Sequence, residues 1–261
     1  MLLAEIHGHV LEAATGDEDY LTSAVFGHLR YVPPSVFWEA FLAESKGLPI
    51  ETSLCQKLST RGPRISEYAS LKVHFWPRHA EFGEPDLLLH FSGTGLQPLV
   101  VLTEVKLWAG KSNRGERDQL VDYVKILSDL RHLKTNEALP DRPLLALLYL
   151  TPRESVGEIR ESLNLLEVES TDFLGVFRAQ WQDLVAVATR TAPSAAETAK
   201  TILKDVQHFL QRRGLEYFRG FKELPSLLAF DSHESAFYVS DLFLSRPQLD
   251  AFAIRRGEWA Q

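Results

Sequence analysis

Residues 84 to 106 read EPDLLLHFSGTGLQPLVVLTEVK and contain two apolar runs, Asp86–Phe91 and Leu99–Lys106. Their length and their content of Leu, Val and Phe are typical of β-strands. The intervening Ser-Gly-Thr-Gly is a turn signal, so the two runs are expected to pair as an antiparallel hairpin. A similar run, Leu71–Trp76, precedes them. The three runs therefore predict a three-stranded antiparallel meander.

The segment after the meander predicts a helix and then a fourth strand. Asp118–Leu133 has apolar residues three and four apart, which is the helical period. Pro143 introduces Leu144–Leu150, an almost wholly apolar run that suits a strand buried on both faces. Upstream of the meander, Asp17–Tyr31 shows helical spacing as well. The order helix, three strands, helix, strand predicts an α/β core.

Further elements are predicted on both sides of this core. On the N-terminal side, helices are expected at Leu2–Ala14 and from Pro34 through Leu42 to the break at Gly47. On the C-terminal side, the pattern predicts helices at 154–165, 181–191 and 195–212 and a short strand at 173–177. We expect a core at 1–152 with N-terminal helices and a mainly helical extension at 153–261 packed on it, unless the two form one continuous domain. The last forty or so residues have no assigned element.

The composition narrows the class of protein. A chain of 261 residues with 45% hydrophobic content is long enough for one large domain or a domain with a helical extension. No apolar run reaches the roughly 18 residues of a membrane helix, and Glu5, His7 and His9 interrupt the apolar core that a signal peptide needs. The expectation is a cytoplasmic protein with no membrane span. Cys55 is the single cysteine, which excludes an internal disulfide and leaves a structural zinc site without obvious ligands.

The formal net charge of −7 argues mildly against a free-standing, nonspecific nucleic-acid binder, because phosphate contacts usually come from a basic surface. A divalent cation can offset a cluster of carboxylates locally, and a partner protein could supply affinity for DNA. Basic residues also gather near one position in the sequence, at Lys106, Lys111, Arg114 and Arg117.

Charged residues at the ends of the predicted strands indicate chemistry. Side chains two apart on a strand share a face, so Glu104 and Lys106 project together while Val105 points into the opposite layer. Asp86, at the start of the neighbouring strand, can lie beside them. Two carboxylates and a local backbone carbonyl suit Mg²⁺ or Mn²⁺. Lys106 could then position a water, assist its deprotonation or stabilise charge on a phosphoryl group.

The predicted helix after the third strand carries Gln119 and Tyr123. Because these residues are four apart, they lie on one helix face, and Asp122 is one residue off that face. Their amide and phenol could hold Lys106, a metal-bound water or a DNA phosphate.

The motifs Pro85-Asp86, Glu104-x-Lys106 and Gln119-x-x-x-Tyr123 resemble the PD-(D/E)xK nuclease superfamily, and the last of them resembles its exonuclease and resolvase branch. The resemblance covers somewhat over half of the chain. It implies a restriction-endonuclease-like core of helix, three-stranded meander, helix and strand. It also implies Asp86 and Glu104 as metal ligands and Lys106 as the catalytic lysine.

Many members of this superfamily place a further glutamate on the helix before the sheet. Glu18 is the best candidate for this third metal ligand, because Glu18, Thr22, Phe26 and Leu29 trace one helical stripe. Glu12 could serve instead if the helix had a different phase.

Simpler interpretations stand beside the catalytic one. Asp86 could cap a turn, and Glu104 with Lys106 could be a solvated pair on an edge strand. Against this, both follow the apolar run Leu99–Leu102, where unpaired charges are costly. His74 and His79 are expected to be structural or surface residues, since the carboxylates lack the histidine spacing of a zinc hydrolase.

The first functional hypothesis is a Mg²⁺-dependent nuclease that hydrolyses phosphodiester bonds, with DNA favoured as the substrate and RNA left open, and with prokaryotic DNA repair or phage defence as one role. Whether it acts as an endonuclease or an exonuclease stays open. A homodimer is one way to cleave both strands. The second hypothesis is a noncatalytic nuclease-fold subunit that binds a partner protein or nucleic acid.

Overall fold

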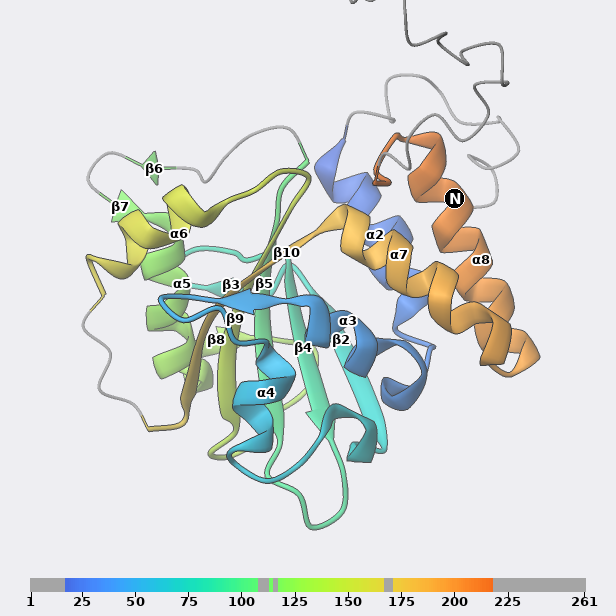
Figure 1. Ribbon diagram of the computed structural model, residues 1–261. Helices are drawn as coiled ribbons and strands as arrows, with labels where there is room; N and C mark the ends of the chain where they lie inside the picture. The colour runs from blue at the N-terminus through green and yellow to red at the C-terminus, as the bar shows by residue number, and fades with distance from the viewer. Residues whose placement is uncertain (1–16, 108–112, 115–116, 167–170, 218–261) are drawn as a thin grey trace, which may run out of the picture. The chain divides into compact units, whose positions relative to one another are not determined.

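A mixed six-stranded sheet forms the centre of the computed structural model of the chain (Figure 1), which describes residues 17–217 apart from 108–112, 115–116 and 167–170. The strands run in the order β1 (Lys46–Gly47), β10 (Phe173–Gln180), β9 (Leu144–Thr151), β5 (Leu99–Val105), β4 (Leu87–Ser92) and β2 (Ser70–Phe75). The described residues belong to one compact unit. The chain is therefore a mixed α/β protein.

The antiparallel meander predicted from the sequence is confirmed. Strand β4 pairs antiparallel with β2 on one side and with β5 on the other. Strand β9 then pairs parallel with β5, and all eight of its residues are buried, as expected of a strand covered on both faces. Strand β10 pairs parallel with β9, so the segment beyond residue 152 adds a strand to the same sheet.

Helices precede, connect and follow the strands. They are α2 (Glu18–Leu29), the π-helical turn η2 (Pro34–Trp38), α3 (Glu39–Glu44), α4 (Leu54–Ser59), α5 (Gln119–Ser128), α6 (Val156–Leu163), α7 (Trp181–Thr191) and α8 (Glu197–Arg212), with short 3₁₀ turns η3 (Ile65–Glu67), η4 (Leu130–His132) and η5 (Ala192–Ser194). Two small ribbons pair β3 (Arg78–His79) with β8 (Leu133–Lys134) and β6 (Asn113–Arg114) with β7 (Arg117–Asp118). The helix predicted at Leu2–Ala14 lies outside the described residues.

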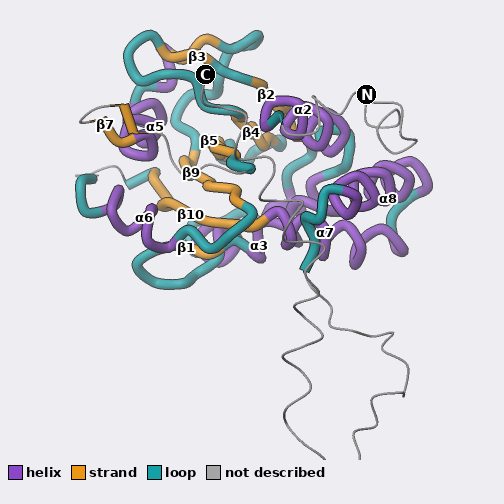
Figure 2. Tube along the Cα trace, turned by 90° about the horizontal axis from the view of Figure 1, so that it is seen from above, coloured by secondary structure: helices purple, strands orange, loops and turns teal. Residues whose placement is uncertain are grey.

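The helices cover the two faces of the sheet unequally (Figures 1 and 2). Successive side chains of β5 point to opposite faces. Leu99, Val101 and Val105 join the larger hydrophobic cluster, to which α2, α3, α7 and α8 contribute. Val100 and Leu102 join a smaller cluster with α5 and α6 on the other face. Val105 therefore points away from the α5 face, as the strand period predicts.

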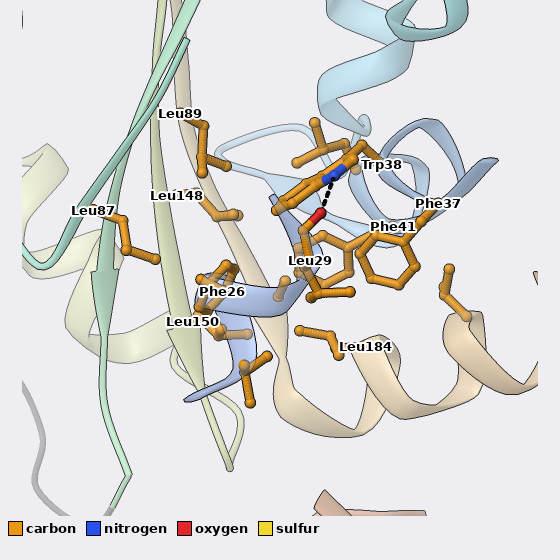
Figure 3. Close-up of a cluster of buried hydrophobic side chains, with 14 of the residues drawn as sticks. Phe26, Leu29, Phe37, Trp38, Phe41, Leu87, Leu89, Leu148, Leu150 and Leu184 are labelled. Carbon is orange, nitrogen blue, oxygen red and sulfur yellow. Dashed lines mark hydrogen bonds between the residues drawn. The ribbon is translucent and has the colours of Figure 1, made fainter. Parts of the chain in front are cut away.

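The larger cluster fixes α2 against the sheet (Figure 3). The fully buried indole of Trp38 donates a hydrogen bond to the carbonyl of Leu29 at 3.3 Å, which ties the end of α2 to η2. Phe26, on the same helix, lies 6.2 Å from Trp38 between ring centroids. This packing sets the position of α2, and hence of Glu18 in its first turn.

The region from residue 44 to 60 differs from the sequence prediction. The predicted helix from Pro34 to Gly47 ends at Glu44, and extended backbone at Ser45 leads into β1. Helix α4 follows and was not predicted, although Ser53 and Gln56 form a reciprocal capping box at its start. That Ser-x-x-Gln pattern is a recognised helix-start signal.

Among the described residues, no helix combines the length and apolar character needed to cross a membrane.

Candidate active site

Asp86, Glu104 and Lys106 meet at one end of two neighbouring strands. The register of β4 and β5 pairs Leu87 with Thr103, which places Asp86, just before β4, beside Glu104 near the end of β5. Lys106 follows β5 directly. All three side chains are buried, with relative exposures of 9%, 1% and 6%. The sequence prediction that these residues cluster is confirmed, and the solvated edge-strand alternative is wrong because β5 is an inner strand.

Asp86 is held in place on both its backbone and its side chain. Its carboxylate accepts a hydrogen bond from the backbone N–H of Val105 at 2.7 Å. Its carbonyl accepts one at 2.9 Å from the N–H of Trp76, which takes a left-handed φ of 47°. Burial, together with the charge of Glu104, raises the pKa of Asp86 to about 8. Two crowded carboxylates resist carrying two negative charges unless a cation joins them.

Glu104 has one engaged oxygen and one free oxygen. Its Oε1 atom accepts a hydrogen bond from the amide of Gln119 at 2.7 Å and forms an ion pair with Lys106. Its Oε2 atom is buried and has no hydrogen-bond partner among the described residues. Burial raises the pKa of Glu104 despite the nearby lysine. An unpartnered buried carboxylate oxygen is costly and is the kind of atom that a metal ion would satisfy.

Lys106 lies between two glutamates. Its Nζ atom pairs with Glu104 and lies 3.2 Å from Oε1 of Glu18. Burial alone would lower the pKa of Lys106, but the charges of Glu104 and Glu18 outweigh it and raise the pKa. The lysine therefore keeps its proton at neutral pH in this arrangement.

Gln119 and Tyr123 share one face of α5, as predicted. The helix begins after Asp118, whose carboxylate accepts hydrogen bonds from the N–H groups of Leu120 and Val121 at 3.0 and 3.2 Å. The amide of Gln119 contacts Glu104 and also donates to the Tyr123 hydroxyl at 3.0 Å. That hydroxyl donates to the carbonyl of Glu84 at 3.1 Å. These two residues thus orient Glu104 and the chain before Asp86.

Glu18 reaches the site from α2, over the end of the sheet. Its Oε1 atom contacts Lys106, and its Oε2 atom accepts the backbone N–H of Leu107 at 2.7 Å. Both oxygens are therefore engaged with the chain, and its role as a third metal ligand stays a prediction. Glu12, the alternative, lies outside the described residues.

A cavity of about 600 Å³ is lined by Asp86, Glu104, Lys106, Gln119 and Tyr123, whereas Glu18 is not among its lining residues. One wall is the arm, which we define as residues 78–84 between β2 and β4. A backbone bridge between His79 and Gly83 closes the arm at 2.8 Å, and the φ of +106° at Gly83 suits glycine. Arg117 joins the arm to α5, because its guanidinium donates to the carbonyl of Glu81 at 3.0 Å and to the carboxylate of Asp122 at 2.9 Å.

Of the four basic residues expected near the site, two are placed with their side chains. Lys106 lies at the floor of the cavity and Arg117 in its wall. Lys111 and the side chain of Arg114 lie outside the described residues. Arg78 also lines the cavity and was not predicted.

A second group of side chains whose atoms could bind a metal ion lies at the arm and consists of His79, Asp129 and His132. Nδ1 of the buried His79 faces the N–H groups of Glu81 and Phe82, both at 3.2 Å. A neutral imidazole that accepts at Nδ1 carries its proton on Nε2, the atom that faces Asp129 at 3.5 Å. The ring therefore presents an N–H rather than a lone pair, and we interpret His79 as an anchor of the arm.

Trp181 is a residue of the site that the sequence did not reveal. Its fully buried indole, at the start of α7, donates a hydrogen bond to the carbonyl of Lys106 at 2.9 Å. The amide of Lys106 donates to the carbonyl of Leu150 at 2.8 Å. The backbone of the lysine is thereby fixed from both sides.

We predict that Trp181→Phe lowers the free energy of unfolding by about 1–2 kcal/mol, since one buried hydrogen bond is lost. Trp38→Phe is a matched control, because its indole also makes one hydrogen bond within the same hydrophobic cluster. Denaturant unfolding should show similar losses for both variants. Any activity that depends on the Asp86, Glu104 and Lys106 cluster should fall further in Trp181→Phe than in Trp38→Phe, and equal rates would contradict a positioning role for Trp181.

Comparisons with known proteins assign no relative to the chain: no family model, curated protein or solved structure matches it. The chemistry of the site is therefore argued from its own residues. Asp86 and Glu104 offer carboxylate oxygens, one of them unpartnered, and hard oxygen ligands of this kind fit Mg²⁺ or Mn²⁺.

Proposed function

We propose that this protein is a Mg²⁺-dependent nuclease of the PD-(D/E)xK class that hydrolyses DNA phosphodiester bonds. The observation that carries the proposal is the convergence of Asp86, Glu104 and Lys106 in one cavity, on adjacent strands, with Gln119 bonded to Glu104. Buried charges brought together in this way are costly to the fold, which favours a functional reason for them. The order of α2, the meander, α5 and β9 also supports the restriction-endonuclease-like core that the sequence motifs imply.

The charges that line the cavity favour binding of a metal ion over direct binding of a phosphate. Its lining includes five carboxylates and three cationic side chains, namely Glu81, Glu84, Asp86, Glu104 and Asp122 against Arg78, Lys106 and Arg117. With all five carboxylates ionised, a phosphodiester would meet net negative charge there unless a cation were bound. Asp86 and Glu104 would hold the ion. When bound, Mg²⁺ supplies a Lewis acid for the phosphoryl group and lowers the pKa of a bound water.

The residues of the chain have separate tasks in this proposal. Gln119 and the backbone N–H of Val105 fix the orientations of Glu104 and Asp86. Lys106 keeps its proton in the metal-free site, because neighbouring carboxylates raise its pKa, and in this proposal it supplies a cation for developing negative charge. Glu18 holds the ammonium group in place at 3.2 Å.

The test is cleavage of circular and linear DNA with Mg²⁺, with Mn²⁺ and with a chelator. Wild type should cleave only with metal, and Glu104→Gln should lose the activity. Glu197→Gln, an exposed glutamate on α8, is the control for loss of one carboxylate and should match wild type. Cleavage of circles would identify an endonuclease. A folded wild-type protein that binds Mn²⁺ but cleaves no DNA would overturn the proposal in favour of a noncatalytic subunit.

A further inference from the structure

A second cavity, of about 370 Å³, adjoins the catalytic one. The two share four lining residues, Glu81, Phe82, Arg117 and Asp122. They are therefore neighbouring compartments, and Arg117 and Glu81, which are joined by a hydrogen bond, line both of them. A polymeric ligand that occupied the catalytic cavity would pass Arg117 on its way into the second cavity.

Charge in the second cavity is organised around one buried carboxylate. Asp122 is 8% exposed, binds the Nε atom of Arg117 at 2.9 Å and has Lys125 at 3.7 Å. Asp118, also in the lining, uses its carboxylate for the cap of α5 and for the hydroxyl of Ser162 at 2.9 Å. The carboxylates of Asp118 and Asp122 are thus already engaged within the chain. Glu81 also lines this cavity, so its lining carries three carboxylates against the two half-exposed cations Arg117 and Lys125. An anionic ligand would therefore bind through Arg117 and Lys125, whose side chains are open to solvent.

The same cavity offers apolar surface. Leu165 lines it and is 64% exposed, one of the few large hydrophobic side chains with such exposure among the described residues. Phe82 and Val121 add to this surface, and the ammonium of Lys125 lies 5.7 Å from the centroid of the Phe82 ring. A ligand with an anionic group and a flat apolar body matches this lining, and a nucleotide has both.

Arg117 stands at the junction with its orientation fixed. Its guanidinium has five N–H donors, and its hydrogen bonds to Asp122 and to the carbonyl of Glu81 fix its plane. Its side chain is 51% exposed. A planar, pre-oriented guanidinium is well suited to a phosphate, because little side-chain freedom is lost on binding.

We propose that the second cavity is a subsite for the second nucleotide from the cleaved bond on the same DNA strand. Arg117 contacts the phosphate between the two compartments, Lys125 contacts the next phosphate, and Leu165 packs against the base or sugar. The proposal rests on the nuclease function and specifies where the substrate strand continues.

The experiment compares dinucleotides with longer single-stranded DNA oligonucleotides as substrates. Wild type should favour the longer substrates in kcat/KM, and Lys125→Ala should reduce this preference by about fivefold to tenfold, the effect of losing one phosphate contact. Fluorescence anisotropy gives the DNA-binding constant at each salt concentration. In Lys125→Ala, the plot of log binding constant against log salt concentration should be less steep than in wild type, by about 1 in the magnitude of the slope. Leu165→Ser should reduce the length preference without changing the salt slope.

Lys204→Ala is the control, since Lys204 is an exposed lysine on α8 outside both cavities. If Lys125→Ala and Lys204→Ala behave alike while wild type cleaves DNA, the subsite is wrong and the nuclease function stands. If wild type neither cleaves nor binds DNA, both proposals fail.

Discussion

Lys106→Met should lower the rate of metal-dependent DNA cleavage by about a thousandfold, the effect of removing one preorganised, buried charge from the site. Methionine keeps much of the length and apolar stem of lysine but carries no ammonium group. In the fold, Lys106 is 6% exposed and is flanked by Glu104 and Glu18, so no other described cation occupies its place between these carboxylates. Single-turnover cleavage of labelled DNA with saturating Mg²⁺ measures the effect.

The control for Lys106→Met is Lys204→Met on the surface of α8, which should cleave at the wild-type rate. Mn²⁺ binding, measured by calorimetry, should persist in Lys106→Met because Asp86 and Glu104 remain. A loss smaller than about tenfold with metal binding intact would remove Lys106 from the catalytic residues. Loss of metal binding as well would mean that the lysine organises the ligands rather than the reaction.

The strands and the central cluster were predictable because they depend on local patterns. The two-residue period of a strand places Glu104 and Lys106 on one face and Val105 on the other, and the structure confirms this arrangement. A short turn between apolar runs set the pairing of β4 with β5, which brings Asp86 beside Glu104. The four-residue spacing of Gln119 and Tyr123 likewise placed both on one helix face.

The arm was not predictable, because its contacts join residues far apart in the sequence. Arg78 pairs with Lys134 through a ribbon of two residues a side, which leaves almost no periodic signal. Arg117 holds the arm through a backbone carbonyl, and any residue at position 81 could supply that group. Trp181 was missed for the same reason, since an indole that binds a carbonyl leaves no pattern at the partner position.

Asp86→Asn should make the metal-free protein more stable while it removes the response to metal. In the fold, burial and the charge of Glu104 raise the pKa of Asp86 from 3.8 to about 8. The folded state therefore binds this proton more tightly than the unfolded chain, and the group makes the fold less stable as pH rises from about 4 to about 8. Asparagine carries no charge, and its side-chain oxygen can still accept the hydrogen bond from Val105.

The expected gain at pH 8 is on the order of 2 kcal/mol, or a rise in Tm of roughly 5 °C for a domain of this size. The gap between the variant and wild type should narrow as the pH falls toward 5. Saturating Mg²⁺ should stabilise wild type by about 3 kcal/mol at a hundred times its Kd and leave Asp86→Asn unchanged. Thermal unfolding across pH, with and without Mg²⁺, measures all of these differences.

Asp141→Asn is the matched control, because Asp141 is an exposed aspartate outside the site. It should change neither the pH profile nor the response to Mg²⁺. If Asp86→Asn destabilises the metal-free protein, the carboxylate is a structural cap and not a ligand under electrostatic strain. If the variant is stabilised and Mg²⁺ still raises its Tm as in wild type, the strain at Asp86 is real but the ion binds elsewhere. Stabilisation without a metal response is the result that an ion held between Asp86 and Glu104 requires.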